Sequence, residues 1–377
     1  MIIRKHEFHI RGFALSDSDI LIFFPLLFLT GLGIVMVYSA SSALALRKFG
    51  SDYHFLIRQA VFVFAGFVLL FVCRHIPLKF LRSFTYSILG ISLGLLIGVL
   101  IPGLGVSAGG AVRWLKFGTY TFQPAEFARF ALVLYLAYSL DKKQERIQEF
   151  SIGFVPHGMI LGLMCVPVLF QPDFGTAAIF FAITWIMMFA GGVSFRHLGT
   201  SLVLVILPAW CLLISAPYRM RRLTSFLNPW EYAGDEGYQT IHSLMAFGTG
   251  GVWGTGLGKG YQKLFYLPEP HTDFIFSVLG EELGLVGVLF VILCYAVIIR
   301  QGIRIAGNTE NSFLTLLALG LTVSLGLQVC INMGVALALL PTKGLTLPFL
   351  SYGGTSMLVN MASVGILMNI GRSQYEK

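Results

Sequence analysis

Long apolar runs separated by short polar connections dominate the chain. A helix of about 20 apolar residues crosses the hydrocarbon core of a bilayer, which is about 30 Å thick. Runs of that kind occur near 19–41, 56–74, 84–104, 122–140, 152–170, 174–192, 197–215, 274–299, 312–336 and 355–371. Several contain Gly or Pro, which neighbouring helices can accommodate within a membrane. The pattern predicts an all-α polytopic membrane protein with about ten transmembrane helices.

Composition supports a membrane protein and argues against several other classes. Only 12% of the 377 residues are charged, whereas soluble domains carry about 25%. The net charge of +8 is spread over the connections between runs, so we expect no nucleic acid partner. The five cysteines all lie inside apolar runs, which argues against a disulfide framework or a zinc site. No polar linker divides the chain, which we expect to form a single transmembrane domain over residues 1–377.

The distribution of Lys and Arg predicts the orientation. Basic residues in short connections are more frequent on the cytoplasmic side of a membrane. They are enriched in the N-terminal segment and in every second connection after it, which places both ends of the chain in the cytoplasm. The first apolar run is longer than a signal-peptide core and should remain as an anchor. Residues 216–272 then form a large extracytoplasmic loop between the seventh and eighth helices, and the remaining polar segments gather on the same face.

The large loop is glycine-rich, but it does not carry a phosphate-binding loop. Its stretch GTGGVWGTGLGKG lacks the required first Gly at Trp253, and Gly260 rather than Ser or Thr follows Lys259. A structureless connection of this length is unusual in a compact domain and is often functional. Nucleotide binding is therefore not expected, and the loop itself becomes a candidate for function.

Asp273 stands where this loop meets the eighth apolar run. An Asp in a first helical turn can simply complement the helix dipole. Against that reading, Glu281 and Glu282 follow in the same run, about 12 Å deeper at 1.5 Å per residue, and ionisable groups within a membrane are candidates for function. Glu281 lies about 80° around the helix from Asp273 and can share a cavity with it. Glu282 faces the other side, where we expect a structural pairing with another helix.

Two similar motifs, FQPAEFAR at 122–129 and FQPDFGTA at 170–177, each open an apolar run with Pro followed by a carboxylate. This arrangement suits a helix start, and capping is the favoured role for Asp173. Glu126 has Arg129 three residues later on the same helical face. An ion-pair scaffold and a substrate site are therefore both open for Glu126.

Three cations lie in the outer segments beside these carboxylates. Arg113 and Lys116 belong to AVRWLKFG, and Lys343 is the only cation of PTKGLTLPFLSYGGTSM. The Gly, Pro and hydroxyl residues of the last motif indicate irregular backbone, which membranes tolerate where it is covered by protein or lines a cavity. All three could be interface anchors. A cavity that combines them with carboxylates would instead suit an anionic, amphiphilic substrate.

The motifs quoted above, together with QKLFYLPEPHTDFIFSVLGEELG, resemble the SEDS family of shape, elongation, division and sporulation proteins in the same order and over nearly the whole chain. The resemblance is greater to the division and sporulation members than to the elongation members, whose last motif usually lacks the Lys. Departures are small: Pro270, Ala125 and Thr355 replace residues common in the family, and no charged position is lost.

The resemblance implies a peptidoglycan glycosyltransferase in the bacterial cytoplasmic membrane that polymerises lipid II. It also implies a class B penicillin-binding protein as transpeptidase partner, together with other membrane proteins of division. The family's catalytic Asp maps onto Asp273 and its important carboxylate onto Glu126. Forming a β1,4 bond from an α-linked pyrophosphate requires inversion, with Asp273 as general base and cations stabilising the leaving group. A divalent cation (Mg²⁺ or Mn²⁺) could share that work, although no metal-ligand spacing predicts one.

One prediction about the site follows, and two other classes of function remain open. We expect Asp273, Glu126 and Glu281 to line one outward-opening cavity with Arg113, Lys116 and Lys343 at its rim. A lipid II flippase would also need carboxylates at membrane depth and helices broken by Gly or Pro. A non-catalytic scaffold that recruits a transpeptidase would tolerate loss of Asp273.

Overall fold

The computed structural model describes residues 8–10, 13–15, 17–108, 111–118, 120–214, 217–235, 237–264 and 266–373. A helix coincides with each of the ten predicted runs: α1 (Asp17–Phe49), α2 (His54–His75), α4 (Thr85–Gly98), α5 (Pro124–Lys142), α6 (Val155–Phe170), α7 (Phe174–Ala190), α8 (Phe195–Ile214), α11 (Ile275–Asn308), α12 (Ser312–Ala336) and α13 (Gly354–Ser373). Shorter helical segments are α3 (Leu78–Ser83), α9 (Pro217–Leu227), α10 (Tyr238–Gly250), η1 (Gln144–Arg146), η2 (Phe150–Phe154) and η3 (Pro229–Tyr232). The chain is mostly helical, as the apolar pattern predicts.

Six helical segments in the described part of the chain are long and apolar enough to cross a membrane: Asp19–Phe49, His54–His75, Phe150–Phe170, Ile275–Asn308, Ser312–Ala336 and Gly354–Ser373. The helices Thr85–Gly98 and Phe174–Ala190 are apolar but shorter. Large apolar side chains such as Phe64 and Phe170 are more than 70% exposed. An apolar surface of this kind is stable against lipid and not against water, so the chain is a multi-pass membrane protein.

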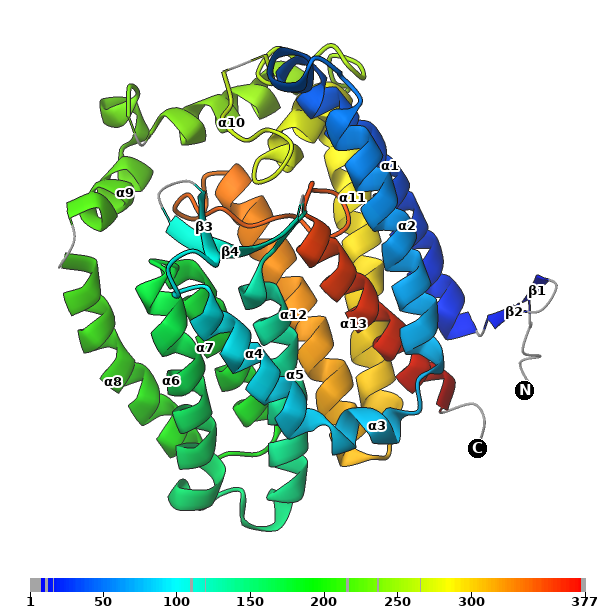
Figure 1. The fold of residues 1–377 in the computed structure, drawn as a ribbon, viewed down its shortest axis with the longest axis vertical. Coiled ribbons are helices and arrows are strands. Elements are labelled where there is room, and N and C mark those ends of the chain that lie inside the picture. The colour runs from blue at the N-terminus through cyan, green and yellow to red at the C-terminus, as the bar shows by residue number, and fades with distance from the viewer. Residues whose placement is uncertain are drawn as a thin grey trace.

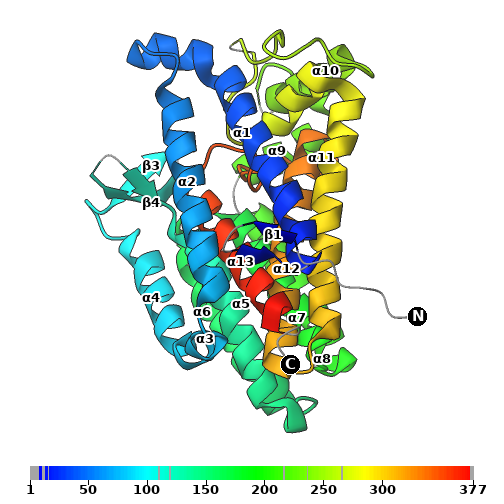
Figure 2. The same cartoon turned by 90° about the vertical axis from the view of Figure 1, so that its right-hand side faces the viewer.

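The helices form one bundle with a clear order of packing. α2 packs on α13, α11 packs on α12 and α1, and α12 packs on α5, which also contacts α4. α8 and α9 lie at the periphery of the bundle (Figure 1). α10 and the α1–α2 connection lie at one end of the molecule, called here the α10 end, and α3 lies near the other (Figures 1 and 2).

The first and last long helices are fastened at the end opposite α10. Asp19 of α1 forms a buried ion pair with Arg74 of α2 at 2.7 Å. Asn369 of α13 donates from Nδ2 to the carbonyl oxygens of Cys73 and Ile76, at 3.1 and 2.6 Å. The start of α1 and the end of α13 therefore lie at the same end of the bundle, as two termini on one side of a membrane require.

The connections contain short strands that the all-α prediction does not include. Five short strands are described: β1 (Phe8–Ile10), β2 (Phe13–Leu15), β3 (Gly105–Ala108), β4 (Ala111–Phe117) and β5 (Tyr120–Phe122). β1 and β2 form one antiparallel pair, and β3, β4 and β5 form an antiparallel sheet in that order. These segments are too short for a length-based reading of apolar runs. The 216–272 connection is also not structureless, since it contains α9, η3 and α10.

The expected depth of Glu281 and Glu282 is also wrong. Gly284, at φ 65° and ψ −167°, interrupts α11, so the segment before it does not continue the line of the long helix. That first segment packs on α10, with Phe276 against Phe247 at 5.6 Å between ring centroids. Glu282 accepts a hydrogen bond from Ser39 of α1 at 2.7 Å. Both carboxylates therefore lie toward the α10 end rather than deeper in the bundle.

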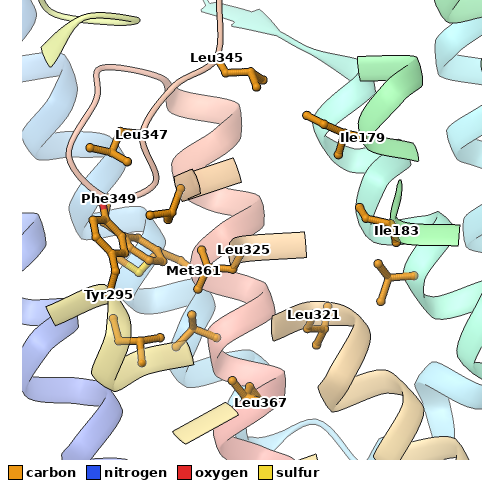
Figure 3. Packing of buried hydrophobic residues seen from close by; sticks show 14 of the residues in the cluster. Ile179, Ile183, Tyr295, Leu321, Leu325, Leu345, Leu347, Phe349, Met361 and Leu367 are labelled. Carbon is orange, nitrogen blue, oxygen red and sulfur yellow. The ribbon is translucent and has the colours of Figure 1, made fainter. Parts of the chain in front are cut away.

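The irregular segment 341–353 between α12 and α13 is inserted into the core. Leu345, Leu347, Phe349 and Leu350 are almost fully buried, and Figure 3 shows this segment packed near Tyr295, Leu325 and Met361. The Tyr295 hydroxyl donates to the Pro348 carbonyl. Irregular backbone that is covered by protein in this way is tolerated at membrane depth, and it gives the last motif a fixed position.

Candidate active site

Asp273 lies directly against the 341–353 segment. A Cβ added to Gly344 would stand 2.8 Å from Asp273 Oδ2, so the carboxyl occupies the space that only a glycine leaves open. Asp273 is half-buried and immediately precedes the first segment of α11. The base predicted from the sequence is thus beside the motif that carries Lys343.

The surroundings of Asp273 favour its neutral form more than water does. Burial, with a smaller contribution from the negative charge of Glu269, raises the pKa of Asp273 to about 7, while Arg113 and Lys343 act in the opposite direction. Desolvation penalises a carboxylate and nearby cations stabilise it. A pKa near 7 suits a group that must both accept and release a proton near neutral pH.

Lys343 lies across the beginning of α7. A Cβ added to Gly175 would stand 2.0 Å from Lys343 Cε, so the lysine stem passes over the bare backbone of the QPDFGTA motif. Its Nζ atom is buried and has no hydrogen-bond partner among the described residues. Burial lowers the pKa of Lys343 to about 8, opposed by the nearby charges of Asp173 and Glu126. A buried ammonium with unused donors is ready to bind an anion.

Arg113 reaches the same place from the β3–β4 hairpin. In this sheet Val106 pairs with Trp114 and Ser107 pairs with Val112, so Arg113 is the extra residue of a β-bulge. Bulges redirect side chains. The Arg113 guanidinium donates to the Pro172 carbonyl at 2.7 Å and stands 3.7 Å from the Asp173 carboxylate. The hairpin therefore carries one cation to the α6–α7 turn.

Asp173 is the N-cap of α7, as predicted. Its carboxylate accepts hydrogen bonds from the Thr176 amide at 3.2 Å and the Thr176 hydroxyl at 2.7 Å. The same carboxylate partly balances Arg113 and Lys343. Capping thus fixes the start of the helix that supports Lys343, and the cap also contributes to the charge of the site.

Glu126 and Arg129 form the predicted ion pair on α5, at 2.8 Å and with both side chains buried. The pair extends into a polar chain. Arg129 donates to Asn360 at 3.3 Å, Asn360 donates to Gln328 at 3.2 Å, and Gln328 donates to the Thr346 carbonyl at 3.1 Å. Glu126 therefore has the ion-pair role that its spacing to Arg129 predicts, and its charge also acts on Lys343. Its assignment to the substrate site stays a prediction.

Lys116 and Glu281 are placed differently from this group. Lys116 is exposed on β4, opposite Thr121 of β5. Glu281 is fully buried, and its carboxylate accepts hydrogen bonds from the backbone amides of Tyr261 at 2.8 Å and Gln262 at 3.2 Å. The structure thus brings Asp273, Arg113, Lys343, Asp173 and Glu126 together, while Lys116 lies at the surface and Glu281 holds a loop. Their assignment to substrate binding stays a prediction.

Glu282 has the structural role expected for it. Its carboxylate pairs with Lys263 at 2.6 Å and accepts hydrogen bonds from Ser39 at 2.7 Å and the Gly258 amide at 3.0 Å. Lys263 also donates to Ser39 at 2.7 Å. The adjacent carboxylates of α11 thus fasten the 251–263 loop to α11 and α1.

In the part of the chain that the structure describes, no group of three or more His, Cys, Asp or Glu side chains is placed to hold a metal ion. Arg113 and Lys343 are the cations that act on Asp273, and a divalent cation that shares their work stays a prediction.

Comparisons with known proteins match nearly the whole chain. Residues 19–376 match the FtsW/RodA/SpoVE family, described as "Cell cycle protein". The chain is 43% identical to the Probable peptidoglycan glycosyltransferase FtsW of Geobacter sp. (strain M18), over 93% of this chain and 96% of the relative. It is 42% identical to the protein of the same name from Nitrosomonas europaea, over 94% and 92% of the two chains.

Solved structures show the same fold. A chain from a peptidoglycan synthase complex, solved to describe the structural coordination of polymerization and crosslinking, superimposes with a TM-score of 0.76 at 27% identity and covers 93% of this chain and 98% of its own. The rod shape determining protein RodA of Thermus thermophilus superimposes with a TM-score of 0.70 at 28% identity, over 94% and 97% of the two chains. These matches confirm the resemblance read from the motifs: the chain belongs to the FtsW/RodA/SpoVE, or SEDS, family of cell cycle proteins.

Proposed function

We propose that this chain is a peptidoglycan glycosyltransferase that polymerises lipid II at the division septum. The observation that carries the proposal is the position of Asp273, half-buried against Gly344 and in the field of Arg113 and Lys343. A base beside two cations is the arrangement that transfer from a sugar pyrophosphate requires. The names of the similar FtsW proteins support the same activity.

The residues divide the reaction between them. Asp273 takes the proton from the acceptor hydroxyl as its oxygen attacks the anomeric carbon of the donor. The bond from that carbon to the pyrophosphate oxygen breaks with inversion, and the electron pair leaves with the pyrophosphate. Arg113 and Lys343 stabilise the charge that develops on this leaving group. Asp173 pairs with Arg113, and the charges of Asp173 and Glu126 favour the protonated form of Lys343. Lys343 Nζ keeps free donors among the described residues.

The finer setting also belongs to this proposal. We place ten transmembrane helices in a single domain, with both ends in the cytoplasm and the 216–272 loop and Asp273 on the extracytoplasmic face of the bacterial inner membrane. The substrate's prenyl chain then lies among the lipids, and its headgroup meets the cations. A class B penicillin-binding protein is the expected transpeptidase partner, as the likeness to a chain of a synthase complex suggests, and other membrane proteins of division are expected to join them.

A purified system tests the proposal. The full chain, in detergent with a transpeptidase-inactive class B penicillin-binding protein, is given lipid II, and glycan products are separated on gels. We expect long strands from the native chain and none when Asp273 is replaced by Asn. If the native complex produced no polymer but moved lipid II between the leaflets of vesicles, the chain would be a flippase. If Asp273→Asn polymerised normally, the base would be wrongly assigned.

A further inference from the structure

The carbonyl groups of three consecutive residues before α11 each accept one hydrogen bond. Two of these bonds come from the 341–353 segment and one comes from α12. The His271 carbonyl accepts from the Tyr352 amide at 2.9 Å. The Thr272 carbonyl accepts from the Ser351 hydroxyl at 2.6 Å, and the Asp273 carbonyl accepts from Asn332 Nδ2 at 2.9 Å. The backbone of residues 271–273, which carries the proposed base, is therefore fixed by one hydrogen bond at each residue.

Of the three donors, Asn332 binds both the backbone of Asp273 and the 341–353 segment. It lies on α12 and is 1% exposed. Its Nδ2 group also donates to the Leu345 carbonyl, at 2.5 Å. A side-chain amide nitrogen has two hydrogens, and here one holds Asp273 while the other holds the residue that follows Gly344. One side chain thus sets the spacing between Asp273 and the stretch that contains Lys343.

The 341–353 segment does not depend on Asn332 for its place in the core. Its apolar side chains are buried, Gln328 binds the Thr346 carbonyl at 3.1 Å, and Tyr295 binds the Pro348 carbonyl. These contacts act farther along the segment, beyond Leu345. The Asn332 bonds act at its beginning, next to the charged groups, where a shift would change the site more than the fold.

We propose that Asn332 is a positioning residue that holds the Asp273 carboxyl and Lys343 at the spacing used in glycosyl transfer. The proposal rests on the polymerase function proposed above. Asn332 does not touch the substrate; it acts through the two backbone carbonyls that it joins.

Because nearby charges act on the pKa of Asp273, a loss of the spacing held by Asn332 can be measured as a change in that pKa. These charges are Glu269 from the preceding loop, Arg113 from the hairpin and Lys343 from the 341–353 segment. Glu269 raises the pKa of Asp273, and Arg113 and Lys343 lower it. When Asn332 no longer holds the beginning of the segment, Lys343 moves away and its lowering effect weakens. The pKa of Asp273 then rises, and the acid limb of the activity profile moves to higher pH.

Asn332→Leu and a matched control variant test the proposal. Asn369 likewise donates from Nδ2 to two carbonyls of another element, but at the opposite end of the bundle. Polymerisation by each purified complex is measured from pH 5.5 to 9, alongside its thermal unfolding. We expect Asn332→Leu to lower the turnover number at least tenfold and to shift the acid limb upward. Asn369→Leu should lose stability without moving the limb, and Asn332→Gln, which keeps the amide, should recover part of the activity.

A second readout does not depend on catalysis. The rate at which water-soluble carbodiimide activates a carboxyl group depends on the protonation of that group. The pH dependence of Asp273 labelling, followed by mass spectrometry and compared between variants under identical conditions, therefore reports a change in its titration. The labelling midpoint should rise in Asn332→Leu and not in Asn369→Leu. Equal midpoints in the two variants would overturn the proposal. If the native complex made no glycan, the polymerase function would fail, and the labelling comparison would still decide whether Asn332 sets the state of Asp273.

Discussion

Two acidic regions only eight residues apart in the chain are built in opposite ways. Glu281 and Glu282 are buried, and their oxygens are occupied by backbone amides, Ser39 and Lys263. Asp273 is held through its backbone, while its carboxyl faces Gly344 and remains half-exposed. Carboxylates whose acceptors are satisfied stabilise architecture, whereas a half-exposed carboxylate can take a proton from a substrate. The partners of an acidic group therefore say more about its role than its depth in an apolar run.

The largest expected effect on the polymerisation rate comes from replacing Asp273. Asp273→Asn keeps the size of the side chain but removes the base, so polymerisation should fall by about 10²- to 10⁴-fold, the usual contribution of general base catalysis. The rate of glycan formation by the purified complex measures this, with thermal unfolding as the check on folding. Activity above a tenth of native would mean that another group accepts the proton.

The second prediction concerns the support under Lys343. Gly175→Ala places a Cβ where the lysine stem lies, 2.0 Å from Cε, so the ammonium must move. Misplacement of a catalytic group by about 1 Å can cost roughly 10²-fold in rate, and we expect a loss of about that size. Gly162→Ala on α6 is the matched control, because nothing lies within 4 Å of its added Cβ. Equal activities for the two variants would remove Lys343 from the reaction.

The third prediction is the pH dependence of the native complex. Burial raises the pKa of Asp273 to about 7, and only the ionised carboxylate can act as a base. Below that pH the ionised fraction falls about tenfold for each pH unit, so the rate should fall with a slope of one. A turnover profile at saturating lipid II measures the limb. A profile that is flat from pH 8 to 5.5 would contradict a base in this environment.

The smallest effect on activity is expected at Glu281, whose carboxylate oxygens already accept hydrogen bonds from backbone amides. Glu281→Gln leaves the backbone amides of Tyr261 and Gln262 without a charged acceptor, and loss of such bonds costs about 1–3 kcal/mol. Thermal unfolding of the detergent-solubilised protein should show this loss. The rate per folded molecule should remain within about twofold of native. A large loss of rate without loss of stability would return Glu281 to the substrate site.

The sequence predicts the helices well because each apolar run responds to the same lipid environment along its whole length. It does not predict the three-stranded β3–β4–β5 sheet, since those strands are short and their pairing depends on contacts across turns. It also misplaces Glu281, because a single Gly at position 284 ends one helical segment within an otherwise continuous apolar run.

Some residues of the candidate site can be predicted from the sequence, and others depend on the tertiary structure. Charged residues are conspicuous in a largely apolar chain, so Asp273, Glu126, Arg113 and Lys343 are found as candidates from their type and from the motifs that contain them. Asn332 is not found, because an amide within an apolar run has the same appearance whether it joins two catalytic segments or caps a neighbouring carbonyl. Its role depends on which two carbonyls the fold brings to its nitrogen, and that is a property of tertiary structure.

The contact between Lys343 and Gly175 also has an evolutionary consequence. The lysine stem occupies the volume in which any other residue at position 175 would place its Cβ, so the two positions cannot change independently. Among homologous chains, those with a larger residue at the position of Gly175 should have a shorter side chain at the position of Lys343. An alignment in which long side chains occupy both positions would show that the two motifs are not coupled through this contact.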